Sequence, residues 1–384
     1  MITNGFYYPN KIWKNKLHTI ESTGAPAGSA LLSFIVGNRR GGKSVGVGIF
    51  TLGDFFCYGY KSVLLRRYIK DFEDSKAPAM ENFWNKSFQF ISEFPDIVSK
   101  DEELKKLYPK PVLDSVDWNP DSHALTFQGH TAYIDGIPFC YPVAINLFNK
   151  TKNTNFDNVH NIIYDEFITE DGSRIPGEVN AVYNLYDTIA RGRPDALQST
   201  SIIFISNAIT YNNDFFTELK LDREIRQDTK YILREDRAAQ VEIVSNEIVS
   251  NSIQQSAFGK ALKFGQIGKL YLGYAQGNTV KDDKSFIMKN AGAKKYLCNI
   301  TYMGKIYAFY ALDSGGFYMT DGEIQENFPV SYALRKEDHT GKTILLTGNL
   351  RTIVRKYKEA YNAGLLCFNS LRSKRAFMEL YSLM

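Results

Sequence analysis

The segment 33–50, SFIVGNRRGGKSVGVGIF, constrains the fold of this chain more than any other stretch. An apolar run ends in a glycine-rich turn that carries Lys43 and Ser44, and a run with helical character follows. The turn fits the pattern G-x-x-x-x-G-K-[ST], in which backbone N–H groups at a helix N-terminus surround phosphate groups. A strand, a phosphate-binding loop and a helix in this order predict an α/β fold.

The rest of 31–210 repeats this alternation. Buried-strand patterns occur at 31–36, 62–68, 161–167 and 201–208, and a helix is expected over 43–57. A second helix is expected over 176–191, where one face is apolar. Its apolar positions are Val179, Val182, Leu185, Tyr186 and Ile189. Strands that alternate with helices predict a mostly parallel sheet.

The remaining segments suggest two domains. We expect a P-loop domain over 1–227, interrupted by an acidic and proline-containing insertion at 71–122. Within it, 124–145 is predicted to form antiparallel strands that turn at Gln128-Gly129 and at Asp135-Gly136. The polar segment 228–256 is interpreted as a linker or lid. Residues 257–384 are expected to form a smaller α+β domain, with a strand meander followed by helices over 349–364 and 370–384.

Composition narrows the class of protein. The four cysteines are scattered without a CxxC pair, which favours reduced thiols in an intracellular protein. Neither a signal pattern nor an apolar run long enough for a bilayer is found, so we expect a soluble, cytoplasmic chain. Residues 256–384 hold 19 Lys and Arg against 10 Asp and Glu, a balance of +9, whereas 1–255 carries −5. The basic part indicates either a polyanionic partner or an ordinary solvated surface.

The phosphate loop predicts the nucleotide-binding residues. Lys43 is expected to reach the β- and γ-phosphates, and the Ser44 hydroxyl to bind Mg²⁺. The predicted nucleotide-binding set is Gly37, Arg39, Gly41, Gly42, Lys43, Ser44 and Asp165. For Arg39 and Arg40 two roles stay open, contact with phosphates or a place at a subunit boundary.

The strand pattern NIIYDEF at 161–167 ends in Asp165 and Glu166, which is typical of a Walker B motif. Asp165 is predicted to hold Mg²⁺ and Glu166 to polarise the attacking water. The DxxG and NKxD motifs of GTPases do not fit, because Lys152 stands where the second motif needs Asp. The pair Asp165-Glu166 therefore predicts ATP hydrolysis rather than a small-molecule kinase or a GTPase.

Two further elements suggest how hydrolysis is sensed. Asn207 ends the strand pattern 201–208, and this strand is expected between the Walker B strand and the phosphate-loop strand. Asn207 would contact the γ-phosphate or the water, although it could also cap a helix. Arg191 and Arg193 follow the predicted helix 176–191. Either they stabilise the helix C-terminus, or one of them is an arginine finger that acts on a neighbouring subunit.

These residues together resemble the DNA-packaging motor ATPases of the small short-tailed phages of the phi29-like group. The resemblance runs nearly end to end. It includes FYYPNKI near the N-terminus, LLRRY at 64–68, and above all IIYDEFITEDGSRIPGEVNAVYNLYDTIARGR followed by ISNA. The pattern DEFI…IPxEVxxxxNLxDT…R is far more specific than a Walker motif.

The resemblance implies a homo-oligomeric ring, a pentamer in the family, that docks on the portal of an empty capsid and moves double-stranded DNA inward with ATP. It implies Glu166 as the catalytic glutamate, Arg191 as the trans-acting arginine and Asn207 as the coupling residue. It further implies a vestigial RNase H-like C-terminal domain that no longer cuts DNA and contacts the portal or a small scaffold RNA. The protein would act in the cytoplasm of an infected bacterium, transiently on the procapsid.

Two alternatives stay open from sequence. One is a terminase-type ATPase with an active C-terminal nuclease, for which the strand meander offers only Asp313 and Asp321. The other is a cellular DNA-pumping or helicase ATPase. Basic residues that are candidates for DNA contact, by charge alone, are Arg66, Arg67, Lys70, Lys150 and Lys152.

Overall fold

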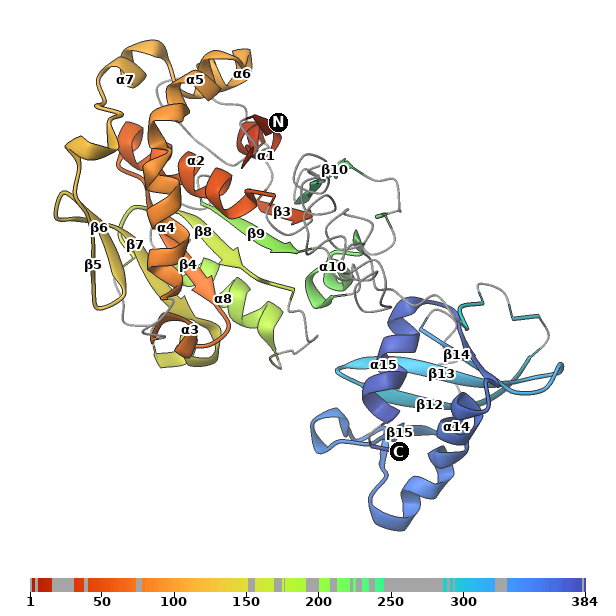
Figure 1. Ribbon diagram of the computed structural model, residues 1–384. Coiled ribbons are helices and arrows are strands. Elements are labelled where there is room, and N and C mark those ends of the chain that lie inside the picture. The colour runs from red at the N-terminus through yellow and green to blue at the C-terminus, as the bar shows by residue number, and fades with distance from the viewer. Residues whose placement is uncertain are drawn as a thin grey trace, which may run out of the picture. The chain divides into compact units, whose positions relative to one another are not determined.

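The computed structural model of the chain is shown in Figure 1. It describes residues 2–3, 6–15, 31–37, 41–73, 78–150, 156–168, 175, 177–190, 200–207, 213–221, 224–225, 230–234, 239–244, 286–288, 291–292, 294–321, 330–381 and 383–384. The chain divides into two compact units, Met1–Val280 and Lys281–Met384. Among the described helices, none is both long and apolar enough to cross a membrane.

The first unit is built on a nine-stranded sheet. In spatial order its strands are β10 (Tyr231–Leu233), β11 (Ala239–Val244), β3 (Leu32–Gly37), β9 (Ser201–Asn207), β8 (Val159–Asp165), β4 (Lys61–Arg66), β7 (Ile137–Ala144), β6 (Thr131–Ile134) and β5 (Leu125–Gln128). Pairing is parallel from β11 to β7 and antiparallel at the two edges. The prediction of a mostly parallel sheet is confirmed, and the carboxyl ends of β3, β9, β8 and β4 lie along one edge.

Two helices of this unit match their predicted positions closely. The helix that follows the phosphate loop, α2, spans Lys43–Tyr58. The helix expected over 176–191 is α8 (Glu178–Ala190), and its predicted apolar face is turned to the core, with Val182, Leu185 and Ile189 buried. The antiparallel strands of 124–145 also form, but their first turn is Gly129-His130 rather than Gln128-Gly129, since Gln128 still pairs with Thr131.

The prediction of a linker over 228–256 is wrong for its described part. β10 and β11 lie in this range, and β11 pairs in parallel with β3 along its whole length. The polar residues of this segment suggested a linker, but the polar side chain of Gln240 is buried in β11 and has hydrogen-bond partners there. Its amide nitrogen donates to Ser33 Oγ at 2.8 Å and to the Ile12 carbonyl at 3.0 Å. The predicted start of the second domain at 257 falls outside the described residues.

The predicted insertion contributes to the core of the first unit. Its helices are α3 (Lys70–Glu73), α4 (Ala79–Gln89), α5 (Phe94–Ser99), α6 (Glu102–Leu107) and α7 (Lys110–Asp114). Phe83, Trp84 and Phe94 are buried in the same hydrophobic cluster as Phe50 of α2, and the rings of Phe50 and Phe94 are 5.4 Å apart. The segment is therefore a helical layer over α2.

The N-terminal segment covers the start of α2. β1 (Ile2–Thr3) and β2 (Phe6–Tyr7) form a two-stranded ribbon, and α1 (Asn10–Lys14) follows. The Tyr7 N–H donates to the Gly41 carbonyl at 3.2 Å. Gly46 in the first turns of α2 allows this approach, because a Cβ there would lie 2.0 Å from the Tyr7 carbonyl oxygen.

We expect Gly46→Ala to lower the free energy of unfolding of the first unit by about 1–3 kcal/mol, the usual range for overpacking. The clash is with a backbone atom, so rotation of a side chain cannot relieve it. Denaturant unfolding followed by tryptophan fluorescence measures the change. Lys110→Ala, at an exposed lysine of α7 in the same unit, is the control. Equal stability of the two variants would contradict the prediction.

The second unit contains a six-stranded mixed sheet. Its order is β16 (Ile344–Leu345), β15 (Ser331–Ala333), β12 (Lys294–Tyr302), β13 (Lys305–Leu312), β14 (Phe317–Thr320) and β17 (Leu366–Phe368). β12, β13 and β14 form the predicted antiparallel meander, and the other three strands add in parallel. The two predicted C-terminal helices are α14 (Thr352–Asn362) and α15 (Leu371–Tyr381), which pack on the sheet.

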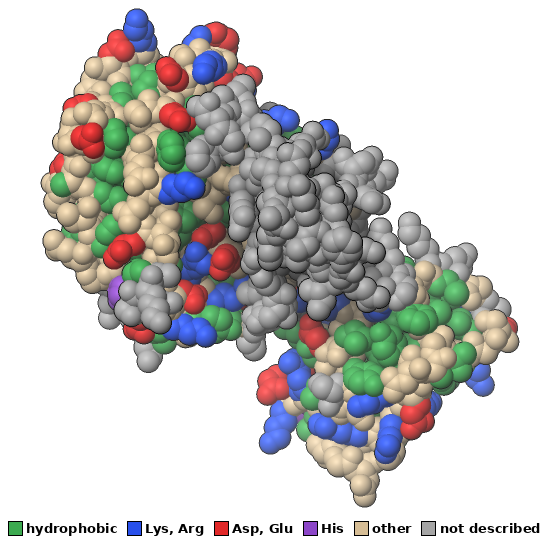
Figure 2. Space-filling view, viewed as in Figure 1, with side chains coloured by type: hydrophobic (Ala, Val, Ile, Leu, Met, Phe, Trp, Pro, Cys, Tyr) green, Lys and Arg blue, Asp and Glu red, His purple; other side chains and the backbone are tan. Residues whose placement is uncertain are grey.

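Basic side chains are spread over the visible face of the second unit (Figure 2). Lys336, Lys342, Arg355 and Lys356 are exposed, so part of the +9 charge of the C-terminal segment is accessible to a partner.

Candidate nucleotide-binding site

A pocket of about 530 Å³ lies at the carboxyl edge of the parallel sheet in the first unit. Its described lining residues are Gly41, Gly42, Lys43, Ser44, Val45, Lys86, Asp165, Glu166, Ile205, Ser206 and Asn207. The pocket thus joins the phosphate loop and the start of α2 to the ends of β8 and β9. Most of the residues predicted from separate motifs to bind nucleotide or to act in hydrolysis line this one space.

The N-terminus of α2, a 16-residue helix that follows the phosphate loop, lies at the pocket. Gly42 occupies the N-cap position with φ +77°, a left-handed conformation that suits glycine. Without a side chain, Gly42 cannot accept hydrogen bonds from the first turn as Ser or Asp would at an N-cap. A helix N-terminus of this kind favours an anion through its N–H groups and its dipole. Gly42 and the start of α2 therefore fit a phosphate ligand.

Lys43, the first residue of α2, is buried, with 6% of its surface exposed. Its ammonium donates to the Gly37 carbonyl at 3.2 Å and to Asn207 Oδ1 at 3.4 Å. Burial lowers the pKa of Lys43 to about 8, although the nearby Asp165 carboxylate opposes the shift. A buried lysine with a depressed pKa gains most from an anionic ligand, because the ligand restores the lost solvation of its charge.

Asp165 and Glu166 stand at the end of β8 with different exposures. The Asp165 side chain is 10% exposed and that of Glu166 is 65% exposed. Burial raises the pKa of Asp165, while the adjacent Arg66 opposes the shift. Glu166 has φ +60°, which is uncommon for a residue other than glycine, and its N–H donates to the Ile205 carbonyl at 2.8 Å. This turn directs the two carboxylates into the same pocket.

The oxygen ligands in the pocket are suited to Mg²⁺. The Ser44 hydroxyl and the Asp165 carboxylate both line it, and Mg²⁺ is commonly held by one or two protein oxygens together with substrate phosphates. Within the described part of the chain, no cluster of three or more His, Cys, Asp or Glu forms a metal site made of protein alone.

Asn207 lies where the sequence analysis placed it. β9 runs between β3 and β8, and Asn207 pairs in register with Gly37 at the end of β3. Its amide oxygen accepts the hydrogen bond from Lys43. Ser206 accepts a hydrogen bond from the Ile168 N–H at 3.3 Å and donates to the Ile168 carbonyl at 2.9 Å, which anchors the chain after Glu166.

Arg66 and Arg67, which charge alone made candidates for DNA contact, have partners inside the first unit. Arg66 Nη2 lies 2.5 Å from Asp165 Oδ2, and Nη1 lies 2.7 Å from Glu166 Oε2. Arg66 therefore supplies the counter-charge of both Walker B carboxylates. The structure does not support the predicted DNA contact for this residue, because its guanidinium pairs with the two carboxylates at the end of β8. Sequence reasoning missed this pairing.

Arg67 is 7% exposed and contacts the chain that follows β8. It donates to the carbonyls of Glu166 and Phe167 at 3.0 and 2.6 Å, and it pairs with Glu178 at 2.9 Å. Tyr164 donates a hydrogen bond to Glu178 as well. Arg67 thus joins the backbone after β8 to the start of α8, and its burial contradicts the predicted DNA contact.

The other predicted site residues are only partly placed. Lys70 is exposed on α3, and its proposed DNA contact stays a prediction. Arg39, Lys152, Arg191 and Arg193 lie outside the described residues, as does the side chain of Lys150. Lys86 was not predicted at all. It lines the pocket from α4, inside the segment that appeared to be an insertion, and no local motif marks it.

The sequence is similar to proteins that package phage DNA. Residues 99–384 match the family model of the Podovirus DNA encapsidation protein (Gp16). The DNA packaging protein of Bacillus phage phi29 is 24% identical over 354 residues, which cover 91% of this chain and 93% of that protein. The DNA packaging protein of Bacillus phage B103 is 24% identical over 361 residues, covering 92% and 97%.

Solved structures show that the fold is shared over the whole chain. A chain of the bacteriophage Phi-29 viral genome packaging motor assembly has a TM-score of 0.67 and 23% identity, covering 99% of both chains. The Phi-28 gp11 DNA packaging motor has a TM-score of 0.60 and 17% identity, covering 99% of this chain and 98% of that one. The family model spans most of the sequence, and the sequence relatives span nearly all of it. The chain therefore belongs to the Podovirus DNA encapsidation protein (Gp16) family and is a DNA packaging motor protein of the phi29-like phages, as the resemblance predicted.

Proposed function

We propose that this protein hydrolyses ATP with Mg²⁺ and uses the energy to move double-stranded DNA into a procapsid. The observation that carries the proposal is the convergence of Asp165 and Glu166 on the phosphate loop, across β9. A binding site alone would not need the exposed carboxylate of Glu166 beside a buried, arginine-paired Asp165.

Each residue of the pocket has a separate role in the proposed reaction. The N–H groups at the start of α2 and the Lys43 ammonium bind the phosphates. Ser44 and Asp165 would hold Mg²⁺, which would supply positive charge to the phosphate oxygens. Glu166 orients the attacking water and accepts its proton, a role that its exposed carboxylate can perform. Asn207, hydrogen-bonded to Lys43, links the state of the phosphate site to the end of β9.

Action as a ring is the second part of the proposal. A homo-oligomer, pentameric by resemblance, would place Arg191 or Arg193 of one subunit at the nucleotide of its neighbour, where such an arginine contributes roughly 10³–10⁵ in rate. α8 supports this arrangement, because it ends at Ala190 directly before these arginines and its start is tied to the Walker B region through Arg67 and Glu178.

The second unit is proposed to be a docking domain with a vestigial RNase H-like fold. Its antiparallel meander, extended by two parallel strands on the side of β12, is the strand arrangement of RNase H-like folds. Asp321 is engaged by Arg372 at 3.2 Å and by Asn369 at 2.8 Å, which supports a structural role. The exposed lysines and arginines of this unit suit the portal or a small scaffold RNA. The motor would then act in the infected bacterial cytoplasm, transiently on the procapsid.

The proposal is tested by DNA packaging into procapsids with the Lys43→Ala variant. We expect nucleotide affinity to fall by at least about tenfold, because a charge-assisted contact to phosphate is lost, and packaging to stop. Lys110→Ala, at an exposed lysine of α7, is the control and should package normally. Packaging by Lys43→Ala at the normal rate would refute the proposed site. Duplex unwinding by the wild-type protein would instead support a helicase.

A further inference from the structure

Lys86 brings the segment 71–122 into the nucleotide pocket. Among the described lining residues it alone comes from this segment; the others belong to the phosphate loop, α2 and the ends of β8 and β9. Lys86 lies in the last turn of α4, and its side chain is exposed. A lysine at a helix C-terminus also interacts favourably with the helix dipole.

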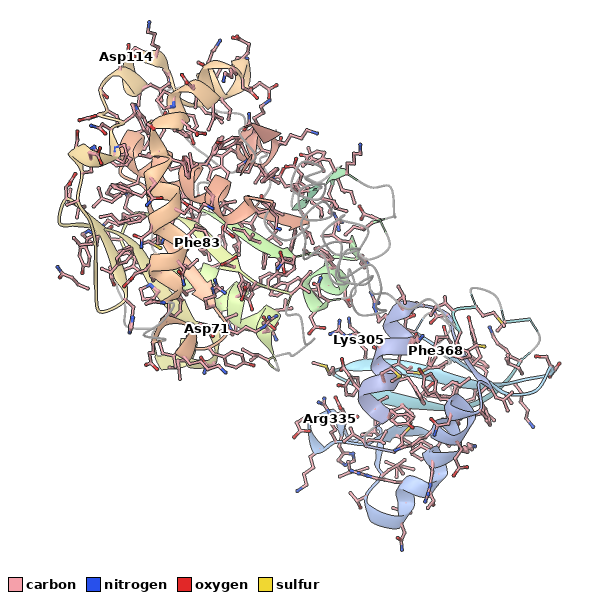
Figure 3. The ribbon with its side chains drawn as sticks, in the orientation of Figure 1. Asp71, Phe83, Asp114, Lys305, Arg335 and Phe368 are labelled. Atoms are coloured by element: carbon pink, nitrogen blue, oxygen red, sulfur yellow. The ribbon has the colours of Figure 1, made fainter. Side chains whose placement is uncertain are left out.

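The helix that carries Lys86 packs directly against the phosphate-loop helix. A Cβ added to Gly48 of α2 would lie 2.1 Å from Ser87 Oγ, so α2 and α4 touch at this point. Ser87 is fully buried and donates to the Phe83 carbonyl at 3.1 Å. Figure 3 marks Phe83 on the same helix. Because Gly48 lies one helical turn after Ser44, the contact fixes Lys86 near the start of α2.

The charges of the pocket leave a role for a further cation. Asp165 and Glu166 are paired with Arg66, and Lys43 is buried at the start of α2. A nucleoside triphosphate carries negative charge on each of its phosphate groups, so more than one cation can contribute to its binding. A lysine carries a point charge on a flexible four-carbon stem, so Lys86 can reach a phosphate group from α4.

We propose that Lys86 is a second phosphate-binding lysine, through which the 71–122 segment determines how tightly the pocket binds a nucleoside triphosphate. The inference rests on the proposed nucleotide-binding function. It assigns to the segment a part in ligand binding in addition to its part in the hydrophobic core.

The test compares the binding of fluorescent ATP and ADP analogues to the full-length protein and to Lys86→Gln. The expected result is a dissociation constant for the ATP analogue that is raised about 3- to 10-fold, the range of a partly exposed charged contact. The salt dependence of binding should also become weaker. Lys86→Arg keeps the charge and should bind within about twofold of the wild type.

Lys100→Gln is the matched control. Lys100 is an exposed lysine at the C-cap of α5, in the same segment, and it does not line the pocket. Thermal unfolding without nucleotide should be alike for Lys86→Gln and Lys100→Gln, whereas stabilisation by the ATP analogue should be smaller for Lys86→Gln. Equal affinity of these two variants would overturn the inference.

Lys43→Ala, measured in the same series, separates the two proposals. If Lys43→Ala weakens binding and Lys86→Gln does not, the nucleotide site stands and the role of Lys86 is refuted. If Lys43→Ala binds normally, the proposed nucleotide site itself is refuted.

Discussion

Glu166→Gln is expected to reduce ATP hydrolysis by the assembled motor by about 10²–10⁴-fold, the usual contribution of a general base. Glutamine has nearly the same shape but its amide cannot accept the proton of the attacking water. Its amide oxygen can still accept the hydrogen bond that Arg66 Nη1 gives to Glu166 at 2.7 Å. The turn at residue 166 should persist as well, because it depends on backbone contacts to Ile205 and Arg67.

Nucleotide binding should therefore survive the loss of hydrolysis. We expect the dissociation constant of an ATP analogue to change by less than about threefold. The general base Glu166 acts in the transition state, so its loss should leave the binding of the unreacted nucleotide nearly unchanged. Steady-state phosphate release and equilibrium binding measure the two quantities. Glu81→Gln, at an exposed carboxylate of α4, is the control. If Glu166→Gln retained more than half of the hydrolysis rate, another group would have to be the base.

The sequence was informative wherever a motif and its strand are neighbours in the chain. The phosphate loop lies between β3 and α2, and Asp165 ends β8, so each motif marks its own place. The position of β9 between β3 and β8 was also predicted correctly, because it follows from the class of ATPase that the Walker B glutamate indicates.

The role of Arg66 could not be predicted in this way. β4 pairs with β8 although the two strands are about a hundred residues apart, and only this pairing brings Arg66 to Asp165. The arginine pair in LLRRY looks identical whether it binds DNA or internal carboxylates. Lys86 was hidden for a similar reason, since the packing of α4 on α2 depends on Gly48 and Ser87, which form no recognisable motif.

Asp54→Ala is expected to have the largest effect on stability, a loss of about 3–5 kcal/mol of unfolding free energy for the first unit. Asp54 lies inside α2 and is fully buried. Its carboxylate accepts hydrogen bonds from Tyr108 Oη at 2.5 Å, Asn161 Nδ2 at 3.0 Å and Trp13 Nε1 at 3.3 Å. These donors belong to the N-terminal segment, the 71–122 segment and β8, so the substitution removes an acceptor from a buried donor in each of three parts.

Tryptophan fluorescence during denaturant unfolding measures this effect selectively, because Trp13, Trp84 and Trp118 all belong to the first unit and the chain has three tryptophans. Asp54→Asn keeps one amide oxygen as an acceptor and should lose less than Asp54→Ala. Asp114→Ala, at the exposed C-terminal end of α7, should change the unfolding free energy by less than about 0.5 kcal/mol.

The order of the three variants is the informative result. If Asp54→Ala lost no more unfolding free energy than Asp114→Ala, water would have to replace Asp54 as the acceptor for the three donors. The hydrogen bonds of Asp54 would then contribute little to holding α2 against β8. A large loss would instead connect the two functional elements directly. α2 begins with Lys43 and Ser44 and β8 ends with Asp165, so a network that fixes the helix against the strand also fixes the phosphate loop relative to the Walker B carboxylates. Under conditions in which Asp54→Asn is still folded, its affinity for the ATP analogue should accordingly fall together with its stability.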